Sequence, residues 1–266
     1  MDIESSYNLI LRNSFSWNGW GFYSFLTSNN TIIGNRVHNN NEHGIYLDET
    51  SHSIVSDNLI THNQFGLDLG YSENNTIVQN SIRSNIEEGL RVHFGYNNTI
   101  YHNNFENNTK QVGTTIGHNI WDDGYPSGGN YWDDYNGTDA DGDGIGDNPY
   151  LIPDTEDQDM YPLMEPYEQT ELEIGPISGG LFKIKAEIRN IGWYDAIAIK
   201  WTITIGGRVW SGEISRISPG DSAKISTGFL LGFGRYAIMM TAEASNAQKV
   251  TKTLDGLIIL FFVIIR

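Results

Sequence analysis

A repeat of 22 or 23 residues constrains this chain more than any other feature of its sequence. Asparagines recur at spacings of 22, 23, 22 and 23 residues, and each follows an apolar residue by three positions. This column comprises Asn13, Asn35, Asn58, Asn80 and Asn103. A second column follows five residues later at Asn18, Asn40, Asn63, Asn85 and Asn108. A unit this short is too small for a helical hairpin and predicts one coil of a β-solenoid.

Each repeat also contains a glycine that opens a strand-like run. The runs are "GFYS", "GIYL", "GLDL" and "GLRV", which begin at Gly21, Gly44, Gly66 and Gly89. Their period of two indicates strands, and coils stacked about 4.8 Å apart would place equivalent asparagines above one another. We therefore predict amide ladders in which Asn58 and Asn80 are buried and hydrogen-bonded to their neighbours.

The coils over residues 7–112, written "NNTIxxN" and then "GI.L", resemble the right-handed parallel β-helix repeats of NosD-like proteins. They are also similar to β-helix proteins that bind or cleave carbohydrate. The resemblance implies either copper-site maturation, as in NosD-like proteins, or contact with polysaccharide. Pectate-lyase and polygalacturonase relatives cut acidic polysaccharide with carboxylate or calcium sites on one outer face.

One row of side chains is expected to point outward from the coils. This row consists of the residue two positions after each repeat glycine: Tyr23, Tyr46, Asp68 and Arg91. Stacked tyrosines and an Asp–Arg pair suit a glycan-contact face, but an exposed sheet also carries such pairs for its own stability.

Hydrolysis of polysaccharide and copper binding each need a cluster of side chains that the repeat columns do not predict. Hydrolysis needs neighbouring carboxylates, whereas Asp48, Asp57 and Asp68 fall in different columns. Copper needs converging ligands, whereas the seven histidines fall in scattered columns without a tight pair. The preferred function is therefore non-enzymatic adhesion or carbohydrate contact, with a polysaccharide lyase or hydrolase and a copper-handling protein as alternatives.

Residues 119–167 are rich in Asp, Gly and aromatic residues and are expected to cap the β-helix of residues 1–118. The motif "DADGDGIGD" has the spacing of a calcium loop, with Tyr150 where an EF-hand has glutamate. The expected ligands are Asp139, Asp141, Asp143, the Ile145 carbonyl and Asp147. The motif resembles thrombospondin type 3 and dockerin loops, and a closing ligand could come from Asp154, Asp157 or Asp159. The alternative is a solvated acidic turn.

Residues 168–266 are expected to form an immunoglobulin-like β-sandwich, because short alternating runs are separated by "GG", "SPGD" and "GFG". The stretch "AEIRNIGWYDA" resembles CARDB-type modules. The tail "LIILFFVII" is too short to span a membrane and is expected to be the last strand, buried on both faces. A short membrane-associated tail is the alternative.

Charge and composition limit the partners and the location. Residues 1–170 carry 25 acidic and 5 basic residues, so nucleic acid is excluded as a partner and cations are favoured. Cysteine is absent, which leaves no disulfides or thiolate sites. Five sequons are present, at Asn29, Asn74, Asn97, Asn107 and Asn136. With the resemblance of the cap to archaeal NosD-like surface proteins, these features favour a cell-surface or secreted protein whose N-terminus is incomplete.

Overall fold

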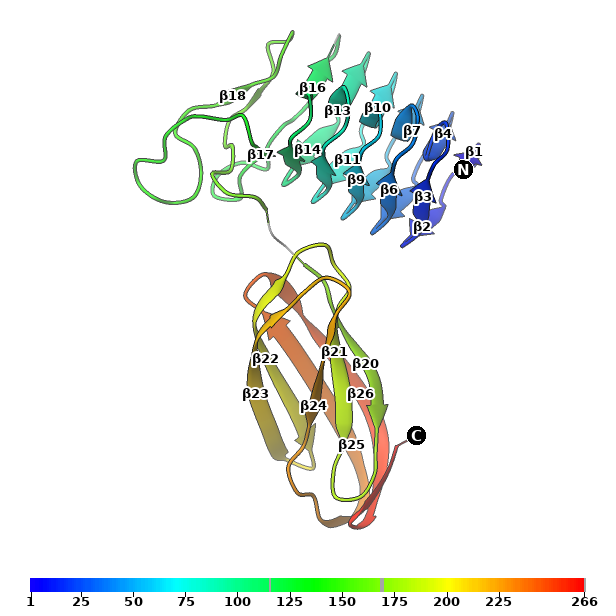
Figure 1. The fold of residues 1–266 in the computed structure, drawn as a ribbon, viewed down its shortest axis with the longest axis vertical. Coiled ribbons are helices and arrows are strands. Elements are labelled where there is room, and N and C mark those ends of the chain that lie inside the picture. The colour runs from blue at the N-terminus through cyan, green and yellow to red at the C-terminus, as the bar shows by residue number, and fades with distance from the viewer. Residues whose placement is uncertain (115, 168–169, 266) are drawn as a thin grey trace. The chain divides into compact units, whose positions relative to one another are not determined.

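A computed structural model of the protein describes residues 1–114, 116–167 and 170–265. The chain divides into two compact units, Met1–Tyr167 and Glu168–Arg266 (Figure 1). The predicted start of the second domain, residue 168, lies outside the described residues. Each unit has its own hydrophobic core.

The first unit is a β-solenoid built from three parallel sheets, as the repeat predicts. Figure 1 shows its coils stacked from the N-terminal coil to the cap. The first sheet has the order β1 (Asp2–Ile3), β4 (Phe22–Phe25), β7 (His43–Asp48), β10 (Phe65–Gly70), β13 (Glu88–His93) and β16 (Lys110–Thr114). The second has β14 (Thr99–Tyr101), β11 (Thr76–Val78), β8 (Ile54–Ser56), β5 (Thr31–Ile33) and β2 (Leu9–Leu11). The third has β17 (Tyr131–Trp132), β15 (Asn104–Glu106), β12 (Ser81–Arg83), β9 (Leu59–Thr61), β6 (Arg36–His38) and β3 (Ser14–Ser16).

The asparagine columns form the predicted ladders. Asn58 is fully buried, and its Nδ2 donates to Oδ1 of Asn80 at 2.9 Å and to the carbonyl of Ile32 at 2.9 Å. Asn35 in turn donates to Oδ1 of Asn58 through its backbone N–H and its amide, both at 2.9 Å. The column that begins at Asn18 repeats this pattern. Each amide thereby satisfies backbone groups that the tight corner would otherwise leave unpaired.

A third ladder runs through Asn8, Asn30, Ser53, Asn75 and Asn98. It was not among the predicted columns, because serine replaces asparagine at position 53 and interrupts the pattern.

The cap, residues 119–167, covers the last coil and ends all three ladders. Trp121 and Trp132 are almost completely buried, and the ring of Trp132 stacks on Phe105 of the last coil with centroids 4.4 Å apart. The ladders then end on carboxylates: Asp157 accepts from the N–H of Asn119 and Asp159 from the N–H of Asn130, each at 2.7 Å. Asp133 accepts from Gln111, which follows Asn108.

These ladder contacts correct one expectation about the calcium loop. Asp157 and Asp159, which lie at and beside the short hairpin of β18 (Tyr150–Leu151) and β19 (Gln158–Asp159), were suggested as closing metal ligands. Asp159 is instead fully buried and also accepts from Nε1 of Trp132 at 2.9 Å. Burial raises the pKa of its carboxyl to about 7, against the opposing effect of these N–H donors.

The second unit consists of two antiparallel sheets that share one core. The smaller sheet has the order β20 (Leu172–Ser178), β21 (Lys185–Asn190) and β24 (Ser222–Ser226). The larger has β23 (Arg208–Ile217), β22 (Ala196–Ile205), β25 (Gly232–Ala244), β26 (Ala247–Leu260) and β27 (Phe262–Ile265). Buried residues of both sheets, such as Ile188 and Ile203, belong to the same apolar cluster.

The apolar tail does not form one strand buried on both faces, so that prediction is wrong. The chain turns at Leu260, which has a positive φ of 56°, and β27 returns along the last residues of β26. Ile258 and Val263 face the core, whereas Leu260, Phe262 and Ile264 are exposed. β27 is the last strand of the larger sheet. On the side away from β26 it meets residues 180–182, through an antiparallel bridge between Leu181 and Phe262 and a hydrogen bond from the N–H of Val263 to the carbonyl of Gly180 at 3.0 Å.

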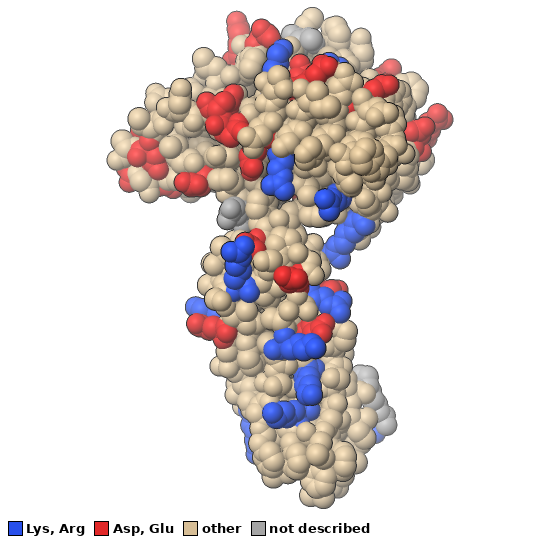
Figure 2. All heavy atoms as spheres, viewed as in Figure 1, with Lys and Arg blue, Asp and Glu red and all other residues tan. Residues whose placement is uncertain are grey.

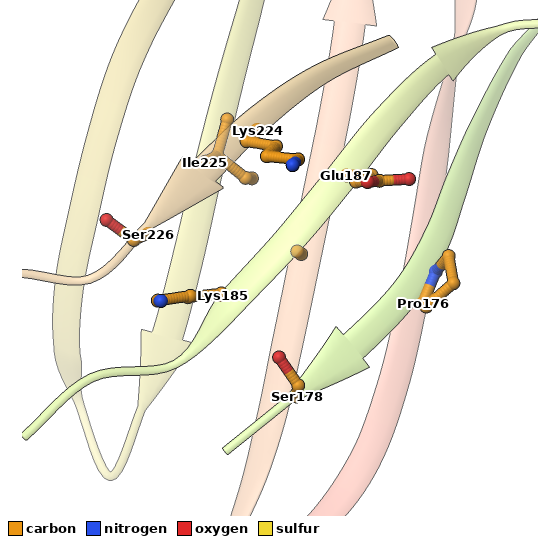
Figure 3. Close-up of a pocket in the computed structure, with 8 residues that line it drawn as sticks. Pro176, Ser178, Lys185, Glu187, Lys224, Ile225 and Ser226 are labelled. Carbon is orange, nitrogen blue, oxygen red and sulfur yellow. The ribbon is translucent and has the colours of Figure 1, made fainter. Parts of the chain in front are cut away.

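An open groove of about 420 Å³ lies on the smaller sheet of the second unit (Figure 3). Its lining combines two lysines and one glutamate with uncharged side chains: Pro176, Ser178, Lys185, Ala186, Glu187, Lys224, Ile225 and Ser226.

Candidate functional site

The predicted outward row lies on the first sheet of the solenoid. Tyr23 is in register with Tyr46, Tyr46 with Asp68, and Asp68 with Arg91. We call the surface built around this row the outer face; it comprises Trp20, Tyr23, His43, Tyr46, Asp48, Phe65, Asp68, Glu88, Arg91 and His93. Parallel strands hold these side chains at fixed spacing, so the face is rigid.

Aromatic rings cover the N-terminal half of the outer face. The centroid of Tyr23 lies 4.7 Å from that of Trp20 and 5.3 Å from that of Tyr46. The imidazole of His43 stacks on Tyr46 at 4.8 Å and on Phe65 at 5.2 Å. Trp20 and the two tyrosines are each partly exposed, so this half of the face offers a continuous aromatic surface to a ligand.

A buried carboxylate occupies the centre of the face. Asp68 is 1% exposed, although its side chain points outward as predicted, and its two oxygens lie 3.1 Å from Nδ1 of His43 and 3.1 Å from Nδ1 of His93. The guanidinium of Arg91 lies 3.8 Å away. Both contacts are within hydrogen-bond distance but poorly aligned, and each becomes an ion pair when its imidazole is protonated.

The repeat columns did not predict this cluster. His43 and His93 do belong to different columns, but they lie on a diagonal across three adjacent strands with Asp68 between them. His43 joins the face because the simple alternation fails at Gly44, where a Cβ would lie 2.8 Å from Nδ2 of Asn63. The sequence signal that could have found the cluster is a diagonal across neighbouring repeats, which a search by columns misses.

The charges of the cluster support one another. Burial raises the pKa of the Asp68 carboxyl, but the two imidazoles outweigh it and hold that pKa below its usual value. Asp68 raises the pKa of His93 against the effect of burial. The carboxylate of Asp68 therefore stabilises the protonated form of His93.

Gly70 lets two polar groups converge beside Asp68. A Cβ at this position would lie 2.7 Å from Nε2 of His93 and 3.0 Å from the hydroxyl of Tyr46, so both groups lie directly over the glycine. The neighbouring Tyr23 hydroxyl donates to Asp48 at 3.1 Å, and burial together with Asp48 raises the pKa of Tyr23 to about 12. Both tyrosines thus keep their protons at neutral pH, since burial also raises the pKa of Tyr46.

A cavity of about 340 Å³ adjoins the cluster toward the cap. Arg91 and Lys110 supply two cations there, and Glu88 contacts both, at 2.9 Å from Nε of Arg91 and 3.9 Å from Nζ of Lys110. His93 and Asp154 complete the charged lining. The cavity can therefore accept a polar, charged group beside the aromatic surface.

The acidic loop is a separate candidate site. The carboxylates of Asp139, Asp141 and Asp143 have ligand atoms within 4.8 Å of one another, so this exposed cluster could hold a metal ion. Asp139 also accepts the backbone N–H groups of Gly142 at 2.8 Å and Gly144 at 3.0 Å, and both glycines have positive φ.

The other two predicted ligands make different contacts. Asp147 accepts from the Thr138 hydroxyl at 2.9 Å and from the N–H of Ala140 at 3.0 Å, which closes the loop at its base. Ile145 pairs with Leu163 through an antiparallel bridge. The structure therefore gathers the first three expected ligands and uses the fourth carboxylate to fasten the loop.

The sequon asparagines share one surface property. All five are exposed: Asn29, Asn74, Asn97, Asn107 and Asn136. The first four have φ between 54° and 56°, because they occupy left-handed corners of the coils.

Comparisons with solved structures find partial likenesses to two enzymes that are each longer than this chain. The periplasmic alginate epimerase AlgG aligns with a TM-score of 0.40 and 28% identity over 44% of this chain, which spans 28% of the epimerase. The enzymatically active domain of tailspike protein 2 from bacteriophage CBA120 aligns with a TM-score of 0.34 and 10% identity, over 93% of this chain and 55% of that one. No curated protein matches the sequence.

The family described as periplasmic copper-binding protein (NosD) matches residues 2–137. The match covers every coil of the solenoid and the first part of the cap, which is just over half of the 266 residues. On this evidence the chain belongs to the NosD family.

Proposed function

We propose that this protein is an extracytoplasmic β-helix protein that contacts carbohydrate through the outer face. The observation that carries the proposal is the continuous aromatic surface of Trp20, Tyr23 and Tyr46 on a rigid parallel sheet. Sugar rings pack their C–H faces on such surfaces, and the polar groups beside them supply hydrogen bonds. The periplasmic description of the NosD family supports the location.

Binding of the full-length protein to a glycan array tests this function. We expect Tyr23→Ala combined with Tyr46→Ala to weaken binding about tenfold or more, because both stacking surfaces are lost. Tyr7→Ala is the matched control, since Tyr7 is an exposed tyrosine outside the outer face. Equal binding by the double variant and the control would refute the proposal.

A second candidate function, acid–base cleavage of an acidic glycan, is favoured by the cluster around Asp68. His93 and His43 could exchange a proton with a bound sugar, while Arg91 and Lys110 could neutralise its carboxylate. The test is release of reducing ends from glycans that bind. Release that His93→Ala abolishes without loss of binding would support an enzyme, whereas binding without release supports contact alone.

Copper, which the family description names, is not favoured at the outer face. Among the described residues, the only group of three or more acidic or histidine side chains that could share one ion is Asp139, Asp141 and Asp143. Those ligands are all carboxylates, which suit calcium better than copper. We therefore propose calcium as the ion of this loop, with a role in holding the cap.

We also propose that the coils wind in a right-handed sense, as the resemblance of the repeat implies. For the second unit we propose an immunoglobulin-like, CARDB-like fold, which agrees with the sequence pattern and with the two antiparallel sheets of this unit.

A further inference from the structure

Three loops of the second unit bring exposed apolar side chains together at one end of the sandwich. The N–H of Phe182 donates to the carbonyl of Phe261 at 2.7 Å, and the N–H of Leu230 donates to the carbonyl of Phe182 at 2.9 Å. The ring of Phe182 stacks on Phe229 with centroids 4.6 Å apart. These contacts fix the loops against one another, so their side chains form one surface.

We call this surface the apolar tip and define it by Leu181, Phe229, Leu231, Phe233, Leu260 and Phe262. These side chains are between 47% and 75% exposed. A soluble domain rarely leaves so many large apolar groups together in water, and aromatic residues at loop ends suit a lipid interface. The described part of the chain has no helix long and apolar enough to cross a membrane.

The charge around the tip selects among possible partners. Residues 179–183, 206–209, 227–235 and 256–265 contain no acidic residue and three basic ones: Lys183, Arg208 and Arg235. All three are exposed, and the guanidinium of Arg208 donates to the carbonyl of Leu231 at 3.4 Å, which places it at this end. In the view of Figure 2 the lower end of this unit shows no red. A second copy packed tip to tip would bring three further cations against these, whereas anionic lipid complements them.

We propose that the apolar tip binds the surface of an anionic lipid bilayer, with its phenylalanines inserted at the headgroup boundary and its basic side chains on the lipid phosphates. This mode needs no spanning segment, because the inserted area comes from loops and a strand edge. The inference is independent of the proposed glycan contact, since it rests on the second unit alone.

Sedimentation of the full-length protein with vesicles tests the proposal. We expect binding to phosphatidylcholine vesicles that contain phosphatidylserine, and weaker binding to phosphatidylcholine alone. Phe233→Ser should lower the partition coefficient about tenfold, the effect of removing one buried phenylalanine from lipid. Trp17→Ser is the control, because Trp17 is 76% exposed against 75% for Phe233 but lies in the solenoid.

A double variant tests the role of charge, and light scattering tests whether the tip binds a second copy of the chain. Lys183→Gln with Arg235→Gln should weaken binding to the anionic vesicles and leave binding to the neutral ones unchanged. The proposal is overturned if neither vesicle binds, if Phe233→Ser and Trp17→Ser behave alike, or if light scattering shows a dimer that Phe233→Ser dissociates. The last result would assign the tip to a second copy of the chain.

Discussion

Asp68 lies on the outside of the coil, where alternation along the strand places it, yet it is completely covered. His43, Arg91 and His93 close over it from neighbouring positions. The sequence predicts the direction of the side chain, because direction depends only on the local strand. Burial depends on His93, one strand away and two residues along, and on His43, one strand away and three residues along, and the repeat columns do not relate such positions. This is why Asp68→Asn, which would be mild at an exposed site, should be costly here.

We expect Asp68→Asn to destabilise the protein by about 1–3 kcal/mol near pH 5.5, because two imidazoles lose the buried charge that they face. Because the pKa of Asp68 is lowered in the folded protein, its carboxylate contributes fully to the free energy of unfolding above about pH 4, the usual pKa of aspartate. Because the pKa of His93 is raised in the folded protein, its imidazolium contributes fully to the free energy of unfolding below about pH 6.5. This contribution is lost as the pH rises through the raised pKa. The difference between wild type and variant should therefore shrink by about pH 9.

Urea unfolding at the two pH values measures this difference. Glu73→Gln is the control, since Glu73 is exposed and should show little change at either pH. A penalty for Asp68→Asn that does not vary with pH would mean that the carboxylate acts by packing and not by charge.

At the scale of the element, the ladders were predictable wherever the repeat is strict. Asn58 and Asn80 pair as expected because their spacing matches one coil. Prediction fails where the period changes: the ladder continues from Asn103 to Asn130 across 27 residues and ends on Asp159 of the cap. The stacking requirement is the same there, but the intervening loop is longer, so the sequence spacing no longer reveals it.

Replacement of a ladder asparagine at the centre of the solenoid should be strongly destabilising. Asn58→Leu removes the acceptor of two donors of Asn35 and the donor to Ile32, so buried groups are left unpaired at about 1–3 kcal/mol each. Asn13→Ala is the control from the same column, because Asn13 is exposed at the first coil. Thermal unfolding should show a much larger shift for Asn58→Leu. Equal shifts would mean that burial in the ladder contributes little.

At the scale of the whole molecule, the solenoid was easier to predict than the second unit. Each coil pairs with the next one along the chain, so one repeat unit predicts the register of every other. The sandwich pairs distant segments: β22 lies beside β25, although two strands separate them in the sequence. Strand-like runs were visible in residues 182–244, but nothing local indicates which run pairs with which, or that the tail folds back as β27.

The acidic loop belongs to the cap, the same segment that ends the asparagine ladders. The loop is anchored to the rest of the cap by the N–H of Gly146, which donates to the carbonyl of Pro162 at 2.8 Å, and by the bridge from Ile145 to Leu163. Leu163 in turn donates its N–H to the carbonyl of Asn130, the last asparagine of its ladder. Neutralising the repulsion among the loop carboxylates should therefore stabilise the solenoid as well as the loop.

We predict that calcium raises the melting temperature of the first unit and leaves that of the second unchanged. Scanning calorimetry of the full-length protein with chelator and with calcium at about 10⁻³ M, the range in which extracellular calcium modules bind, should move one transition upward. Asp141→Asn with Asp143→Asn should abolish the movement, since the cluster then keeps only Asp139 of its three carboxylates. Asp195→Asn with Asp221→Asn, two substitutions in the second unit, should not affect it. Identical scans of the wild type in chelator and in calcium would show that the loop is an acidic turn that holds its shape through the backbone contacts of Asp139 alone.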